Sequence, residues 1–103
     1  MCIRDRAGLP AVVSSAIDSS VGIRAGVALA AALPELPYAC GLGTLSLMEA
    51  DVTAGPLRPV DGFLPVRDVA VDEALLAEHA VTGERRDWWL DRVRRTHALL
   101  AAQ

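Results

Sequence analysis

One segment of this chain has the pattern of a strand, a helix and a second strand in succession. Apolar residues fill most of Leu9–Ser14, and a second short apolar run covers Leu36–Cys40. Between them, the alanine-rich stretch Val21–Leu33 is followed by Pro34, a residue that ends helices. Two strands joined by a crossover helix form a βαβ unit with parallel strands. The sequence therefore predicts the α/β fold class, built on a parallel sheet.

Both predicted strands end in residues that suit a binding site. Ser14 and Ser15 close the first strand, and the glycine loop 41–43 follows the second. Ligands of parallel sheets bind outside the carboxyl ends of the strands, and glycine lets the backbone come close to them. The helix is predicted to have Ser20 as its N-cap, and a helix N-terminus favours an anion. From the residues alone, turn and cap chemistry remains the simpler role for the serines.

The rest of the chain carries local signals for four further elements. The Asp-Gly pair at 61–62 is typical of a two-residue hairpin turn, and neighbouring prolines restrict its strands to a sheet edge. Thr44 and Asp72 are predicted to be N-caps of helices. Apolar residues at helical spacing predict a final amphipathic helix. The predicted elements are a helix Leu45–Asp51, a hairpin of Leu57–Val60 and Leu64–Val66, a helix Asp72–Ala80 and a helix Glu84–Ala102.

Composition excludes several classes of protein. The chain has 103 residues and a net charge of −3, which argues against a dedicated nucleic-acid binder. No apolar stretch is long enough to span a membrane, and no secretory signal is apparent, so we expect a cytoplasmic protein. Cys2 and Cys40 do not make a disulfide framework. His79 and His97 fall on separate predicted helices, so neither is predicted to bind a metal.

The predicted strands cannot complete a fold by themselves. Two parallel strands leave both edges of the sheet open, and a (β/α)8 barrel needs about 250 residues. We therefore expect the chain to be the end of a larger protein. Met1–Gly8 precede the strand pattern, and we expect them to be a non-native or disordered start.

Residues Val12–Gly22, Leu33-Pro34 and Gly41–Thr44 together resemble the C-terminal part of the o-succinylbenzoate synthase family. This is a menaquinone-biosynthesis family of the enolase superfamily, and the resemblance covers roughly residue 8 to the C-terminus. It implies a (β/α)7β TIM-like barrel with a capping domain. Residues 9–55 would then be the last βαβα units of the barrel, and residues 56–103, with the hairpin and two helices, would return to the capping domain.

The resemblance also implies an activity. The family reaction is a Mg²⁺-dependent dehydration in which a lysine base removes a proton alpha to a carboxylate. The family's catalytic lysines and acidic metal ligands lie on earlier strands, and this chain has no lysine at all. The resemblance therefore implies no catalytic residue and no metal ligand here, only residues that bind a small-molecule carboxylate. These residues are Ser14, Ser15, Gly41, Leu42 and Gly43.

Two alternatives stay open from the sequence. The first is another enolase-superfamily enzyme, an N-acylamino-acid racemase or a muconate cycloisomerase. The second is a small α/β module for protein–protein interaction. Within the glycine loop, Gly43 is expected to be more sensitive to substitution than Gly41, because it leads directly into the predicted cap Thr44. The oligomeric state is left open.

Overall fold

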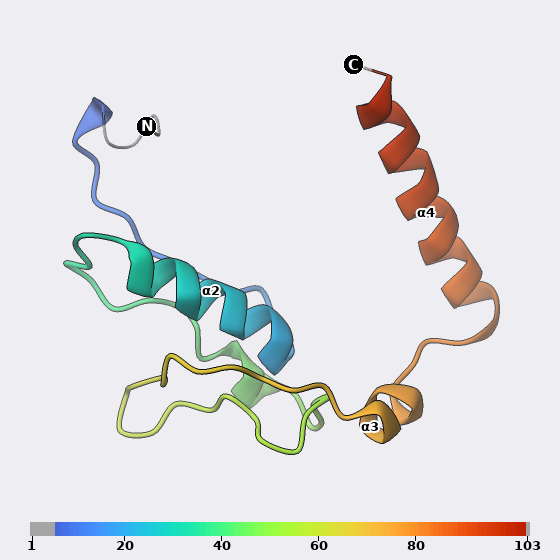
Figure 1. The fold of residues 1–103 in the computed structure, drawn as a ribbon, viewed down its shortest axis with the longest axis horizontal. Helices are drawn as coiled ribbons and strands as arrows, with labels where there is room; N and C mark the ends of the chain where they lie inside the picture. The colour runs from blue at the N-terminus through green and yellow to red at the C-terminus, as the bar shows by residue number, and fades with distance from the viewer. Residues whose placement is uncertain (1–5, 103) are drawn as a thin grey trace.

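The structure, a computed structural model, describes residues 6–102. Its elements in chain order are a helix α2 (Ser20–Ala32), a 3-10 helix η1 (Thr44–Leu47), a short helix α3 (Glu73–Glu78) and a long helix α4 (Gly83–Ala101) (Figure 1). Residues 1–5 of the start predicted to be non-native lie outside the described residues.

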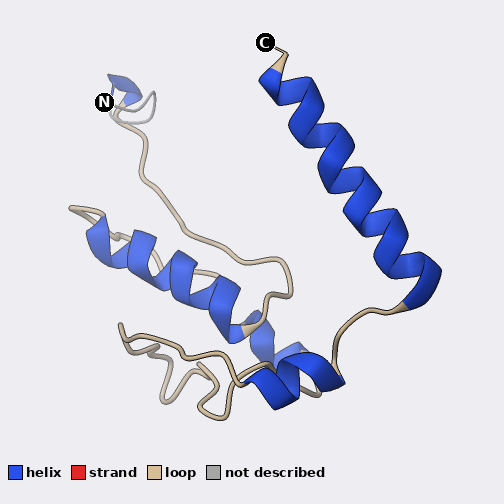
Figure 2. Ribbon diagram, turned by 45° about the vertical axis from the view of Figure 1, so that its right-hand side comes forward, coloured by secondary structure: helices blue, strands red, loops and turns tan. Residues whose placement is uncertain are grey.

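The two predicted parallel strands are reduced to a single contact. Within residues 6–102 no strand is formed, and Ser14 and Gly41 make one isolated parallel bridge (Figure 2). The Gly41 N–H donates to the Val13 carbonyl and the Ser15 N–H donates to the Gly41 carbonyl, each at 2.9 Å. The predicted βαβ unit is therefore not confirmed as a pair of strands, although its two strand ends do meet in parallel.

Proline explains part of this difference. Pro10 lies in the first predicted strand and Pro37 in the second, and neither can donate a ladder hydrogen bond. Among the described residues, the two segments form no ladder beyond the bridge at Ser14 and Gly41. The apolar pattern of Leu9–Ser14 and Leu36–Cys40 is therefore present without the ladder that would make them strands.

Helix α2 begins one residue earlier than predicted, and Ser20 is not its N-cap. Ser19 takes that position and its side chain makes no capping hydrogen bond. Ser20 is fully buried, and its hydroxyl donates to the carboxylate of Asp51 and accepts from the Leu57 N–H at 2.7 Å. The Ser20 N–H donates to Asp51 Oδ1 at 3.1 Å. Asp51, 31 residues away, thus caps the helix in place of a local side chain.

The predicted helix Leu45–Asp51 is replaced by the 3-10 helix η1. Gly43 is the N-cap of η1 and Thr44 is its first residue, so the prediction of Thr44 as the cap is wrong. Asp51 lies outside any helix, where it also accepts from the Val52 N–H at 2.8 Å. The helix ends at Leu47, and Asp51, predicted to be in it, is bound at the start of α2 instead.

The predicted hairpin turn is confirmed. Asp61 and Gly62 have φ values of 50° and 81°, the positive sign that a type I′ turn requires at both central residues. Val60 and Phe63 exchange two backbone hydrogen bonds of 2.9 Å. Pairing stops there, in keeping with the prolines on either side.

The Asp72 cap is also confirmed. Its carboxylate accepts from the N–H groups of Ala74 at 2.9 Å and Leu75 at 3.1 Å. Helix α3 ends at Glu78, two residues before the predicted end at Ala80.

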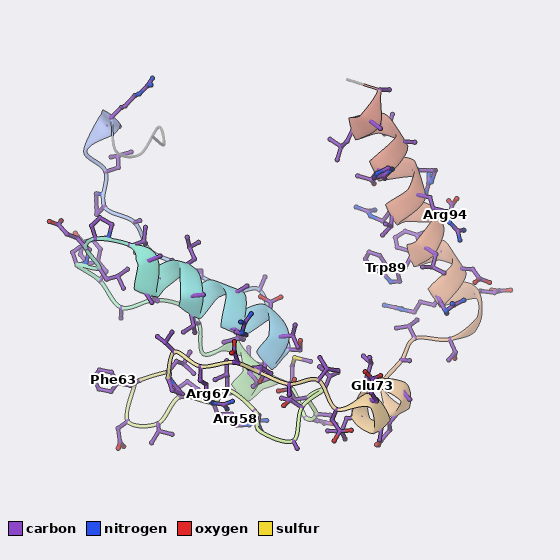
Figure 3. All side chains as sticks on the ribbon, in the orientation of Figure 1. Arg58, Phe63, Arg67, Glu73, Trp89 and Arg94 are labelled. Atoms are coloured by element: carbon purple, nitrogen blue, oxygen red, sulfur yellow. The ribbon has the colours of Figure 1, made fainter. Side chains whose placement is uncertain are left out.

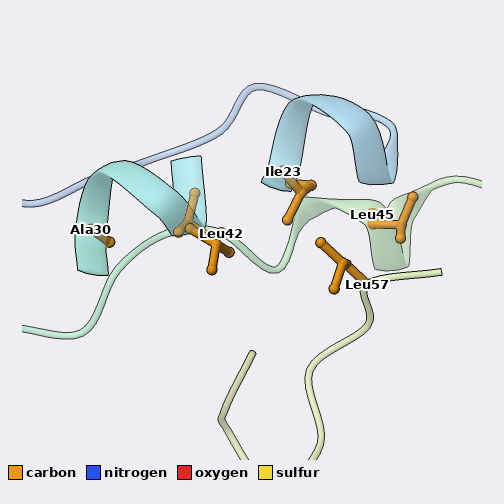
Figure 4. Close-up of a cluster of buried hydrophobic side chains, with 6 residues drawn as sticks. Ile23, Ala30, Leu42, Leu45 and Leu57 are labelled. Carbon is orange, nitrogen blue, oxygen red and sulfur yellow. The ribbon is translucent and has the colours of Figure 1, made fainter. Parts of the chain in front are cut away.

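One face of α2 makes the core. Ile23, Val27 and Ala30 follow helical spacing and pack against a second group of buried side chains (Figure 4). That second group is Leu42, Leu45 and Leu57. A Cβ on Gly26 would lie 2.7 Å from Leu42 Cδ2, so glycine lets the helix come close to the glycine loop.

Helix α4 forms within one residue of its predicted bounds and stands apart from α2 (Figures 1 and 2). None of its residues is buried, so Trp89 does not pack into a core (Figure 3). The Trp88 and Trp89 rings instead meet edge to face at 4.8 Å, with the Arg92 guanidinium near both. No helix among residues 6–102 is long and apolar enough to cross a bilayer.

We predict that the 103-residue chain on its own associates or unfolds without a sharp transition. Its Cα radius of gyration is 16.8 Å, against about 13 Å for a compact domain of 100 residues. Phe63, Trp88, Val93 and Leu100 leave extensive apolar surface in water, which favours association. Sedimentation and thermal circular dichroism would measure this. A monomer with a sharp cooperative transition would contradict the prediction.

Candidate functional site

The hydroxyl side chains of Ser14, Ser15 and Thr44 lie where the serine loop meets the glycine loop. Ser15 Oγ lies 2.6 Å from Thr44 Oγ1 and donates to the Gly41 carbonyl at 3.1 Å. Thr44 can then donate to Ser15, so that each hydroxyl proton has an acceptor. Together with the Ser15 N–H bond, these contacts join the two loops at one point. Ser15 therefore acts as a clamp between the loops.

Ser14 has a different role from Ser15. Its hydroxyl is exposed and has no hydrogen-bond partner among the described residues. The Ser14 side chain lies over Gly41, because a Cβ on that glycine would be 2.9 Å from Ser14 Oγ. A hydroxyl in this position is free to donate to a ligand. The predicted pair of serines is thus divided into one structural hydroxyl and one available hydroxyl.

The glycine loop offers backbone groups rather than side chains. The Leu42 side chain is buried in the core, so only its backbone can face a ligand. The Gly41 N–H is taken by the Val13 carbonyl. Between residues 6 and 102, the N–H groups of Leu42 and Gly43 have no acceptor. Of the five predicted residues, the structure leaves the Ser14 hydroxyl and these two N–H groups free to bind.

The structure reverses the expected order of the two glycines. Gly43 has a φ of −87°, which any residue can adopt, and a Cβ there would meet Pro59 at an ordinary 3.5 Å. Gly41 is crowded by Ser14 at 2.9 Å. The expectation rested on Thr44 being a cap, but its hydroxyl is bound to Ser15 instead.

The electrostatics at the start of α2 differ from the expectation as well. The helix N-terminus predicted to favour a ligand anion is occupied by the Asp51 carboxylate. A bound carboxylate would therefore rely on Ser14 and the glycine loop, not on the N–H of Ser20. Asp51 is the residue of this region that sequence reasoning missed, and Thr44 was expected only as a helix cap.

An apolar groove of about 470 Å³ lies next to the glycine loop. Its lining includes Cys40, Leu42 and Gly43, together with Val27 of α2. The hairpin contributes Phe63, which is labelled in Figure 3. Cys40 is a free thiol and half buried. The groove suits an apolar group, in contrast to the polar edge at Ser14.

The described residues hold no group of three His, Cys, Asp or Glu side chains that could bind a metal ion. Asp51 is directed to backbone groups and Ser20, and Asp68 is paired with Arg24. These residues do not fit a Mg²⁺ site.

Comparison with known proteins identifies the relationship. No family model matches the chain. An o-succinylbenzoate synthase of Mycobacterium leprae is 55% identical over 100 residues, which cover 97% of this chain and 30% of that protein. One from Thermobifida fusca is 66% identical over 76 residues, covering 74% of this chain and 24% of that protein. One from Mycobacterium tuberculosis is 54% identical over 98 residues, or 95% of this chain and 30% of that protein.

All three relatives are o-succinylbenzoate synthases, and they match 97%, 74% and 95% of the chain. By sequence, the chain belongs with the o-succinylbenzoate synthases. The chain spans about 30% of the length of the Mycobacterium relatives. The resemblance carried by the serine segment and the glycine loop is therefore confirmed.

The contact between the loops predicts the effect of substituting each glycine. The measurement uses a chimera, the Mycobacterium leprae relative with its matching segment replaced by this chain. We expect Gly41→Ala to lower the thermal midpoint of the chimera, because the new methyl group displaces Ser14. Gly43→Ala should leave the midpoint nearly unchanged, because it meets only Pro59 at 3.5 Å. An equal loss for both variants would contradict this order.

Proposed function

We propose that this chain forms the part of an o-succinylbenzoate synthase that holds a carboxylate of the substrate. The enzyme would be a lyase that removes water, and its substrate a small-molecule carboxylate in the cytoplasm. The single observation that carries the proposal is that the exposed Ser14 hydroxyl, which lies over Gly41, and the N–H groups of Leu42 and Gly43 in the same loop lack partners among residues 6–102. The identity to synthases over this same segment supports it.

The chemistry of these groups suits a carboxylate. A hydroxyl and two backbone N–H groups are hydrogen-bond donors that remain neutral, and a carboxylate accepts up to four hydrogen bonds. Hydrogen bonds to a charged acceptor are shorter and stronger than those between neutral groups. The bridge at Gly41 and the Ser15 clamp fix both loops before a ligand arrives, which lowers the entropy lost on binding. The neighbouring apolar groove could take a hydrocarbon part of the ligand.

The proposed reaction divides between this chain and other parts of the enzyme. The family that the chain resembles uses Mg²⁺ to stabilise the negative charge that forms when the proton alpha to the carboxylate leaves. The residues described here do not fit that ion, and the chain has no lysine to act as the base. Its proposed role is therefore to bind and orient the substrate. The (β/α)7β barrel, with residues 9–55 as its last units, is the proposed setting for this role.

The chimera tests the proposed function directly. We expect it to form o-succinylbenzoate, and we expect Ser14→Ala to raise KM by the equivalent of about 1.5–3 kcal/mol, the value of a hydrogen bond to a charged group. The thermal midpoint should change little, because the Ser14 hydroxyl has no partner within the described residues. Steady-state kinetics and a melting curve would measure both effects.

Ser15→Ala serves as the matched control. It removes a hydroxyl of the same size that is already bound to Gly41 and Thr44, so it should lower the midpoint of the chimera. An inactive chimera, or an active one whose KM is unaffected by Ser14→Ala, would contradict the proposed function.

The chain alone should not catalyse the reaction. With Mg²⁺ and substrate present, we expect no o-succinylbenzoate, because the sequence contains no lysine base. A spectroscopic assay of the purified chain would test this. Turnover that disappears on substitution of a residue in this chain would contradict the assignment of a binding role.

A further inference from the structure

We propose that Asp51 is a positioning residue for the carboxylate-binding loop. This inference rests on the proposed function and assigns a role to a side chain that does not itself face the ligand. Asp51 Oδ1 accepts from the Ser20 N–H at 3.1 Å and from the Val52 N–H at 2.8 Å. Its Oδ2 accepts from the Ser20 hydroxyl. Ser20 in turn accepts from the Leu57 N–H at 2.7 Å, so one carboxylate joins three segments.

The loop between Ser14 and α2 is therefore fixed at both of its ends. The bridge to Gly41 and the Ser15 clamp fix the end that carries Ser14. Asp51 fixes the end that enters α2 at Ser20. The free hydroxyl of Ser14 has no bond of its own to place it. Its position relative to the glycine loop therefore depends on these two anchors.

Backbone strain in this loop indicates that the two anchors hold a residue in a conformation that it would not otherwise adopt. Ile17 has a φ of 59°, in the left-handed region that β-branched residues rarely adopt. Its side chain is exposed, so burial of Ile17 does not compensate for the strain. Strained residues of this kind persist when the surrounding structure over-determines them. If the Asp51 anchor is weakened, Ile17 is expected to relax and Ser14 to move.

The test compares two aspartates that cap helices. Asp72 binds the N–H groups of Ala74 and Leu75 at the start of α3, a helix with no buried residue. Asp51→Asn and Asp72→Asn each replace a capping carboxylate by an amide of the same shape. In the active chimera we expect Asp51→Asn to raise KM about five- to tenfold, because the amide nitrogen cannot accept the hydrogen bond that the Ser20 hydroxyl donates to Oδ2. We expect kcat to stay within about twofold, since the reacting groups are unchanged.

The control should separate positioning from stability. Asp72→Asn is expected to leave KM and kcat unchanged, even where it lowers the thermal midpoint. Asp51→Asn with an unchanged or lowered KM would overturn the inference, whatever its effect on the midpoint. In that case a raised KM for Ser14→Ala would still support the proposed function. An inactive parent chimera would instead contradict the proposed function itself.

A second variant tests the link through the strained residue. Asn adopts the left-handed region more readily than Ile, so Ile17→Asn should ease the conformation that the anchor maintains. We expect Ile17→Asn combined with Asp51→Asn to return KM at least halfway to the value of the parent chimera. No recovery would overturn the link through Ile17.

A third variant applies if Asp51→Asn prevents folding. Ser20→Ala removes only the hydroxyl and should show a smaller rise in KM. Failure of both to fold, where Asp72→Asn folds, would assign the anchor to folding alone.

Discussion

The packing around α2 depends on the hydrogen bonds that the Asp51 carboxylate accepts. This carboxylate binds the first N–H and the hydroxyl of Ser20, and Ser20 holds the Leu57 N–H in turn. Ser20 is fully buried, so its hydroxyl must be satisfied inside the protein or cost about 1–3 kcal/mol. The same contact brings Leu57 against Ile23 and Leu45 in the core. The polar anchor and the apolar core are therefore formed together.

This dependence explains which elements the sequence could predict. The Asp-Gly hairpin turn and the Asp72 cap use donors and acceptors within a few residues, and both appear as expected. The bounds of α2 follow from its composition and from the proline after it. The cap of α2 comes from Asp51, 31 residues away, and no local signal distinguishes it from an aspartate in a helix. Ser20 and Thr44 looked like caps because serine and threonine suit that role, but both hydroxyls are bound elsewhere.

The same limit applies to the strands and to the candidate site. An apolar run predicts burial, yet a strand also needs neighbours that complete its hydrogen bonds. Among the described residues, the second segment is joined to the first by the bridge between Ser14 and Gly41, the residue that follows Leu36–Cys40. The sequence did predict that the serine loop and the glycine loop would meet. It could not predict that Ser15 is structural and Ser14 is available, because adjacent serines look alike in sequence. They differ in which hydroxyl reaches the Gly41 carbonyl. That difference is fixed by tertiary contacts.

The two anchors act on the loop in opposite chemical settings. At the Ser14 end, neutral donors are left without acceptors between residues 6 and 102, which favours an incoming anion. At the Ser20 end, the helix N-terminus is already matched by the negative charge of Asp51. A helix N-terminus left open would offer a second place for the same anion, and the ligand could bind in two registers. With that end occupied from within the chain, the proposed carboxylate would bind at Ser14 and the glycine loop and not at the start of α2. On this proposal, the internal carboxylate contributes to specificity as well as to stability.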